Sequence, residues 1–250
     1  MLFKTAGFTF KPYAHVGFSG RKLLATRKSD GKKFIVKHEE PECACNEFVY
    51  FSIAKELGLK VLDFHLFEKD DQLFRHNAIA IEFIEKDNSK MGRIADVKSK
   101  IKNSLDYFSH RALEGAFWQG DTFQTIIGND GYIYRIDPTE SFGIDVGTIG
   151  WIKHFGSPRI VPRGESIYGY LKTASNGIKE DGCTAFEHNH FLETLACLNK
   201  IPVKKIEAIV NEVCKLYAPG LKEVYMSFFA DFKKAYKRFQ DGIVANYDFG

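Results

Sequence analysis

A stretch in the middle of the chain constrains the fold most, because it places an aspartate on each side of a short hairpin. Asp121 precedes a predicted strand at residues 125–127, a turn at 129–131 leads into a second strand at 132–136, and Asp137 follows directly. Asn-Asp-Gly is typical of the tight turn that joins two antiparallel strands. The pattern therefore brings two carboxylates to the same end of one hairpin.

Two carboxylates in this arrangement suit phosphoryl transfer. In that chemistry one acid orients the attacking hydroxyl, while another holds the Mg²⁺ ion that neutralises the phosphates. A surface hairpin with solvated aspartates has the same sequence pattern, so the rest of the chain decides between the two interpretations.

The N-terminal part predicts antiparallel strands around a turn that is able to approach a ligand. The strands fall between residues 8 and 37. The turn consists of Gly17, Phe18, Ser19, Gly20, Arg21 and Lys22. Glycines three residues apart allow a backbone turn to come close to phosphate oxygens. Lys37 ends the apolar run 34–37; a lysine there either reaches phosphates or is a solvated strand end.

A helix is expected after the acidic, proline-containing segment 39–42. Asn46 is the predicted N-cap, and the helix runs to Leu57 with Gly58 at its C-terminus. Glu47 falls at the border of the apolar stripe, where it is able to pair with a lysine on a neighbouring strand. A glutamate in a first turn is also favoured by the helix dipole alone.

The order of elements divides the chain into two lobes. Further strands are predicted at 60–67 and 78–84, and the polar connector that starts at residue 85 marks the boundary, giving a β-rich lobe at 1–85 and a helical lobe at 86–250. In the second lobe, residues 93–118 have helical periodicity. Residues 138–182 hold 8 of the 21 glycines and three of the seven prolines, which predicts a long irregular segment.

The end of the chain and the composition further limit the fold and the possible partners. Apolar spacing predicts two closing helices, separated by Pro219-Gly220. The 35 basic and 32 acidic residues leave a net charge of +3, which gives no signal for nucleic-acid binding. No apolar run is long enough to span a membrane and no signal peptide is visible, so we expect a cytoplasmic protein.

Five motifs occur in an order that resembles one family of kinases. They are Gly17–Lys22, Phe34–Lys37, the helix start Asn46–Tyr50, Glu82–Ile84, and the pair Gly120-Asp121 with Ile136-Asp137. This order is similar to that of the HipA-like kinases, which share the protein-kinase-like and phosphoinositide-kinase-like fold. The resemblance covers residues 1–140, and it implies an α+β, bilobal fold with a β-rich N-lobe and a mainly helical C-lobe.

The resemblance also implies roles for individual residues, with ATP and Mg²⁺ as cofactors. Lys37 binds the ATP phosphates and Glu47 orients it, while the loop from Gly17 to Lys22 covers them. Glu82, Phe83 and Ile84 hold the adenine through backbone hydrogen bonds. Asp121 orients or deprotonates the acceptor hydroxyl, and Asp137 coordinates Mg²⁺.

One position departs from the family pattern. The family has an asparagine five residues after the catalytic aspartate, as a second Mg²⁺ ligand, and this chain has Ile126 there. Gln124 is the preferred substitute, and Asn129 is the alternative. The expected function is that of a Ser/Thr protein kinase with a protein substrate. Two alternatives stay open: a catalytically impaired nucleotide-binding or partner-binding module, and a small-molecule or lipid kinase.

Overall fold

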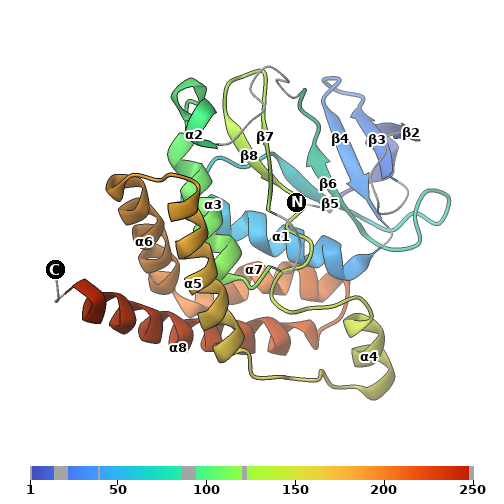
Figure 1. The fold of residues 1–250 in the computed structure, drawn as a ribbon. Helices are drawn as coiled ribbons and strands as arrows, with labels where there is room; N and C mark the ends of the chain where they lie inside the picture. Colours follow the sequence, from blue (N-terminus) through green and yellow to red (C-terminus); the bar gives the residue numbers. More distant parts are fainter. Residues whose placement is uncertain (1, 14–21, 39, 86–93, 120–122, 248–250) are drawn as a thin grey trace.

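The computed structural model describes residues 2–13, 22–38, 40–85, 94–119 and 123–247, and within them the chain has a mixed α+β fold (Figure 1). Helices make up 53% and strands 17% of it. The strands are β1 (Leu2–Phe3), β2 (Phe8–Pro12), β3 (Lys22–Arg27), β4 (Lys33–Lys37), β5 (Phe64–Phe67), β6 (Ala78–Glu82), β7 (Gln124–Ile127) and β8 (Ile133–Ile136). The helices are α1 (Pro41–Glu56), α2 (Ile94–Val97), α3 (Ser104–Ala116), α4 (Thr148–Phe155), α5 (Gly164–Glu180), α6 (Ala185–Lys200), α7 (Val203–Leu216) and α8 (Leu221–Tyr247).

Six strands form one sheet in the order β1-β5-β6-β4-β3-β2. The pairs are antiparallel except for β1 with β5, which is parallel. Alternation along β6 gives the sheet two buried faces, since side chains i and i+2 of a strand point the same way. Ala78 and Ala80 pack in an aromatic cluster with Phe34 and Phe67, while Ile79 and Ile81 join the core shared with the helices.

Helix α1 lies beneath the sheet, between it and α7 (Figure 1). The helix begins at Pro41, five residues before the predicted N-cap Asn46, so that part of the prediction was wrong. Proline is well tolerated in the first turn of a helix, because the missing N–H has no intrahelical partner there. Gly58 follows the helix with a φ of +78°, as expected for its end. Asn46 and Glu47 are therefore interior residues of α1, and both are fully buried.

The helical part departs from the sequence expectation in two places. The predicted helix at 93–118 is broken, because α2 ends at Val97 and α3 begins only at Ser104. The segment 138–182 is not irregular throughout, since it contains α4 and the 17-residue α5. Gly115 on α3 allows α5 to pack closely, because a Cβ there would lie 2.9 Å from the Cβ of Ala174. Gly115 thus serves the packing of α3 against α5.

The closing helices α7 and α8 agree with the prediction. One continuous core joins α1 and the inner face of the sheet to α3, α5, α6, α7 and α8. Within the described residues, no helix is both long and apolar enough to cross a bilayer.

Candidate functional site

A pocket of about 460 Å³ lies between the six-stranded sheet and the β7–β8 hairpin. Its apolar walls come from both sides, with Ile35 and Ile81 from the sheet and Ile126 and Ile136 from the hairpin. Lys22, Lys37 and Asp137 supply charge to the same space. The pocket therefore offers an apolar volume next to a charged group, which is the usual composition of a small-molecule site.

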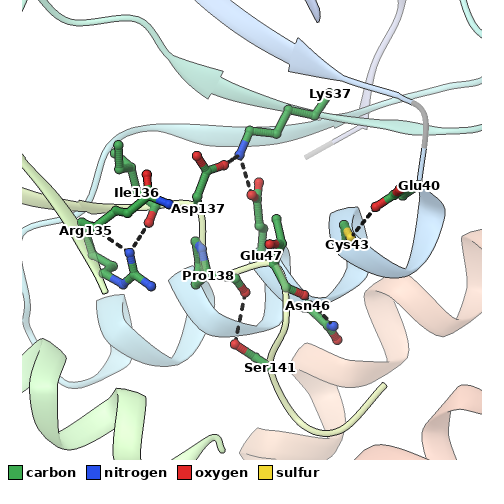
Figure 2. A network of polar contacts seen from close by, with 12 residues as sticks. Lys37, Glu40, Cys43, Asn46, Glu47, Arg135, Ile136, Asp137, Pro138 and Ser141 are labelled. Carbon is green, nitrogen blue, oxygen red and sulfur yellow. Dashed lines mark hydrogen bonds and ion pairs between the residues drawn. The ribbon is translucent and has the colours of Figure 1, made fainter. Parts of the chain in front are cut away.

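Lys37 is held between two carboxylates that come from different parts of the chain (Figure 2). Its Nζ donates to Oε1 of Glu47 on α1 and to Oδ1 of Asp137, which follows β8. Glu47 is completely buried, whereas Asp137 is partly open to the pocket. The three residues proposed from sequence for phosphate, lysine and metal contacts are thus brought together.

Burial and charge act in opposite directions on the pKa values of these groups. Burial lowers the pKa of Lys37, but the charges of Glu47 and Asp137 outweigh it and raise the pKa overall. Burial raises the pKa of Asp137, but the Lys37 ammonium outweighs this effect and holds the pKa below its usual value. For Glu47 burial dominates, and its pKa is raised even though Lys37 opposes the shift. Lys37 and Asp137 are therefore charged near neutral pH.

The backbone of Asp137 is held in an unusual conformation. Its φ is +52°, in the left-handed region, which aspartate tolerates better than most residues but at some cost. Gln119 donates to the Asp137 carbonyl at 3.4 Å, and the buried Arg135 donates to the carbonyls of Gln124 and Ile136. Surrounding hydrogen bonds thus fix the end of the hairpin at which Asp137 lies (Figure 2).

The hairpin register separates the two candidates for a second metal ligand. Gln124 pairs with Ile136, directly beside Asp137. Asn129 is exposed at the far end of the hairpin, where its backbone N–H donates to the Glu85 carbonyl at 3.1 Å. Strand β7 alone spans about 10 Å, and Mg²⁺ ligands lie about 2 Å from the metal. Gln124 is therefore near Asp137, and Asn129 is not.

The donor set at this end of the hairpin fits Mg²⁺ in kind. Mg²⁺ in nucleotide sites takes one or two carboxylates and leaves its other positions to phosphates and water. Asp137 offers a carboxylate at the pocket, and the amide-bearing Gln124 is paired with Ile136, the residue before Asp137. Among the described residues no group of three His, Cys, Asp or Glu side chains forms a closed protein cage for a metal.

The three residues expected to hold adenine all line the pocket, but two of them are already engaged. The Phe83 N–H donates to the Lys33 carbonyl at 2.9 Å, and the Glu82 N–H donates to the Asp63 carbonyl at 2.7 Å. Of the three amides, only that of Ile84 has no acceptor among the described residues. The sequence does not reveal the register in which β6 pairs with its neighbours. The three amides were therefore expected to be equally available.

Several predicted residues lie outside the part of the chain that the structure describes. They are Gly17, Phe18, Ser19, Gly20, Arg21 and Asp121. The structure does describe Lys22, the last residue of the predicted turn. Lys22 begins β3, pairs directly opposite Lys37, and lines the pocket.

Sequence reasoning missed the part that α1 plays in holding the segment after Asp137. Asn46, predicted as a cap, donates from Nδ2 to the carbonyl of Thr139 at 2.7 Å and of Ile144 at 3.2 Å. Its Oδ1 accepts from the hydroxyl of Tyr225 at 2.9 Å. An asparagine inside an apolar helix is the signal that would have indicated this role, because a buried amide needs partners.

Glu42 is a second missed residue of α1. It is 3% exposed, and its Oε1 accepts from the N–H groups of Gly147 and Ile149, each at 3.0 Å. These groups belong to the first turn of α4, which has no side-chain cap of its own. Helix α1 therefore contacts Lys37 through Glu47 and the start of α4 through Glu42.

Comparison of the sequence with models of known protein families and with curated proteins gives no match.

Proposed function

We propose that the chain is an ATP-dependent phosphotransferase, a Ser/Thr protein kinase of the HipA-like type with a bilobal fold. The observation that carries the proposal is the contact of Lys37 with both Glu47 and Asp137 at the edge of an apolar pocket. Phosphoryl transfer depends mainly on positioning and on charge neutralisation. A fixed lysine and a pocket-facing carboxylate supply the parts that hold phosphates and their counter-ion.

In this proposal the pocket holds ATP, with the adenine between the apolar walls. The Ile84 N–H, which has no acceptor among the described residues, is the donor for a ring nitrogen. Lys37 binds phosphate oxygens, and Glu47 keeps the ammonium in place. Lys22 and the preceding loop cover the phosphates. Asp121 orients the acceptor hydroxyl, a role that rests on the sequence pattern alone.

Asp137 and Gln124 are the residues that would hold Mg²⁺. When bound, the ion would neutralise the negative charge of the phosphates. The fixed left-handed backbone of Asp137 keeps its carboxylate directed to the pocket, and this reduces the reorganisation that binding requires.

One observation favours a second candidate, a nucleotide-binding module with impaired transfer. Ile126 stands where the HipA-like pattern has a metal-binding asparagine, and it lines the pocket as an apolar wall residue. Such a protein binds ATP but transfers no phosphate, and its function lies in partner binding.

Incubation of the purified protein with Mg²⁺ and γ-³²P-ATP tests the proposal. We expect label on the protein itself or on proteins of a cell lysate. Lys37→Met abolishes the labelling, whereas Lys33→Met, an exposed lysine on the same strand, leaves it unchanged. Nucleotide binding without any labelling supports the impaired module. Label confined to the lipid or small-molecule fraction identifies a small-molecule or lipid kinase instead.

A further inference from the structure

Exposed apolar side chains are concentrated in and beside α4. Nine large hydrophobic side chains of the described residues are exposed, and five of them fall between residues 146 and 161. They are Val146, Trp151, Phe155, Ile160 and Val161. Soluble proteins rarely gather exposed apolar residues in one place unless that place binds something. In Figure 1, α4 lies at the periphery of the fold and an extended connection joins it to α5.

A pocket of about 340 Å³ opens within this group, and we call it the α4 pocket. Val146, Trp151 and Val161 give it an apolar wall, and Asp145, Arg159 and Arg163 give it charge. It is separate from the Lys37 pocket, with which it shares no lining residue.

The described contacts hold two parts of the wall of the α4 pocket in place, the start of α4 and Arg163. The Glu42 carboxylate caps the first turn of α4. The Arg163 guanidinium lies 4.3 Å from the centre of the Trp118 ring and donates to the Gly143 carbonyl at 2.8 Å. Its backbone N–H donates to Asp231 at 2.7 Å. A pocket with fixed walls binds a ligand without a large ordering cost.

The charge at the α4 pocket favours an anionic partner. Burial lowers the pKa of Arg163, and the Asp145 charge opposes this shift only in part, so Asp145 balances only part of the Arg163 charge. Arg159 is exposed and makes no ion pair with any described residue. One arginine therefore remains available to a carboxylate, and arginine is well suited to bind one through two hydrogen bonds.

The same charge argues against a second copy of this chain as the occupant. A two-fold dimer brings the same patch of both copies together, so two surfaces that each carry Arg159 and Arg163 against one Asp145 would meet with the same sign of net charge. Like charges in a desolvated contact are repulsive. A partner that carries acidic groups avoids this repulsion.

We propose that the α4 pocket is a docking site for an extended segment of a partner protein in which a bulky apolar side chain is next to Asp or Glu. The apolar side chain enters between Trp151 and Val161, and the neighbouring carboxylate binds Arg159. Aromatic and arginine residues provide a large share of binding energy at protein interfaces. The inference goes beyond phosphoryl transfer and does not depend on it.

Fluorescence anisotropy with fluorescein-labelled peptides tests the proposal. The probe is a nonapeptide, Gly-Ser-Leu-Glu-Leu-Glu-Leu-Ser-Gly, and two matched peptides replace its glutamates with glutamine or its leucines with serine. We expect the acidic, leucine-containing peptide to bind at least about tenfold more tightly than either control, because each control lacks one of the two contacts. Equal affinity for all three peptides, or no binding of the acidic one, overturns the proposal.

Variants locate the binding on the protein. Arg159→Gln is expected to weaken binding of the acidic peptide about tenfold and to leave the glutamine peptide unaffected. Trp151→Ala weakens both. Arg75→Gln and Phe186→Ala, which change an exposed arginine and an exposed phenylalanine elsewhere, change neither. Circular dichroism confirms that each variant is folded.

Two results would assign another role to the α4 pocket and its surroundings, and either one overturns the inference. One is a loss of affinity in Arg75→Gln equal to that in Arg159→Gln, which indicates non-specific attraction of charge. The other is a concentration-dependent dimer in analytical ultracentrifugation that Trp151→Ala dissociates, which assigns the patch to contact between copies. The proposed kinase activity is tested independently, because γ-³²P-ATP labelling of the protein itself does not involve the peptide.

Discussion

Lys37 and Asp137 form an ion pair across 100 residues of sequence, and it joins the six-stranded sheet to the end of the β7–β8 hairpin. Glu47 completes the contact from α1. The pocket therefore has its charges arranged before any ligand enters. A ligand with phosphates has to compete with Asp137 for Lys37 unless a cation binds that carboxylate.

Asp137→Asn tests this competition. The variant removes the charge but retains a side chain that tolerates the left-handed backbone. We expect ATP binding without Mg²⁺ to be retained, because Lys37 loses a competing carboxylate, and the enhancement of binding by Mg²⁺ to disappear. Calorimetric titration of ATP with and without Mg²⁺ measures both. If the Asn variant shows the same enhancement as an Asp71→Asn control, which changes an exposed aspartate, Asp137 does not bind the metal.

Lys37→Met is expected to cost about 3–5 kcal/mol of unfolding free energy, because it leaves the buried Glu47 carboxylate without the ammonium group that it contacts. Lys33→Met, at the exposed end of the same strand, is expected to change it by less than about 0.5 kcal/mol. The double variant Lys37→Met/Glu47→Gln recovers part of the loss, because it removes the stranded charge. Urea denaturation followed by circular dichroism gives these values. A single Lys37→Met variant as stable as Lys33→Met would contradict the prediction.

Glu42→Ala removes the carboxylate that caps α4 from outside. We expect a loss of about 1–2 kcal/mol and faster hydrogen exchange in residues 147–151, since two N–H groups lose their acceptor. Glu42→Gln, which keeps an acceptor oxygen, has a smaller effect. Glu68→Ala, which changes an exposed glutamate, serves as the control. Unchanged exchange at 147–151 in Glu42→Ala would show that the cap does not stabilise α4.

His110 gives the protein a defined dependence of stability on pH. Burial on α3 lowers its pKa from 6.5 to about 3, and the Arg135 charge acts in the same direction. Between these values the unfolded chain binds a proton that the folded chain does not, so stability falls as the pH falls. The expected loss from pH 7 to pH 5 is about 2 kcal/mol from this residue.

His110→Phe keeps a ring of similar size and removes the titration. Urea midpoints at pH 7 and pH 5 are therefore expected to differ less in this variant than in the unaltered protein. His76→Gln, which changes an exposed histidine, retains the full difference. His65 and His188, whose pKa values burial also lowers, account for the part that remains in both. An identical difference in His110→Phe and the unaltered protein would exclude His110 as its source.

The elements predicted correctly are those that short stretches of sequence determine by themselves. Strands β3, β4, β7 and β8 and the final helices follow from periodicity and turn residues. The start of α1 was predicted wrongly, because the acidic segment with Pro41 indicates a break in the sequence pattern, whereas proline is well suited to the first turn in which the structure has it. Helix α5 was missed because glycines are common in loops. Packing against α3 stabilises the helix around Gly177, and that contact is not visible in the local sequence.

The candidate site shows the same division. Lys37, Glu47 and Asp137 were proposed from the order of motifs, and the structure brings them together. The contacts of Glu42 and Asn46 join residues about a hundred positions apart, and no local pattern encodes them. The unequal engagement of Glu82, Phe83 and Ile84 likewise depends on how β6 pairs with its neighbours.

The hydrogen bond between Asn46 and Tyr225 makes the contacts of α1 depend on α8, the last helix to be synthesised. Chains leave the ribosome from the N-terminus, so α1 emerges long before α8. Until Tyr225 has been made and has folded, the Asn46 amide oxygen lacks its hydroxyl donor, and the helix that anchors residues 139–144 lacks its full set of partners. Lys37, Glu47 and Asp137 have all been translated before α8, so the chain contains these three residues before the support of the segment beside them is complete. The support of the segment that follows Asp137 is complete only when the last helix has docked.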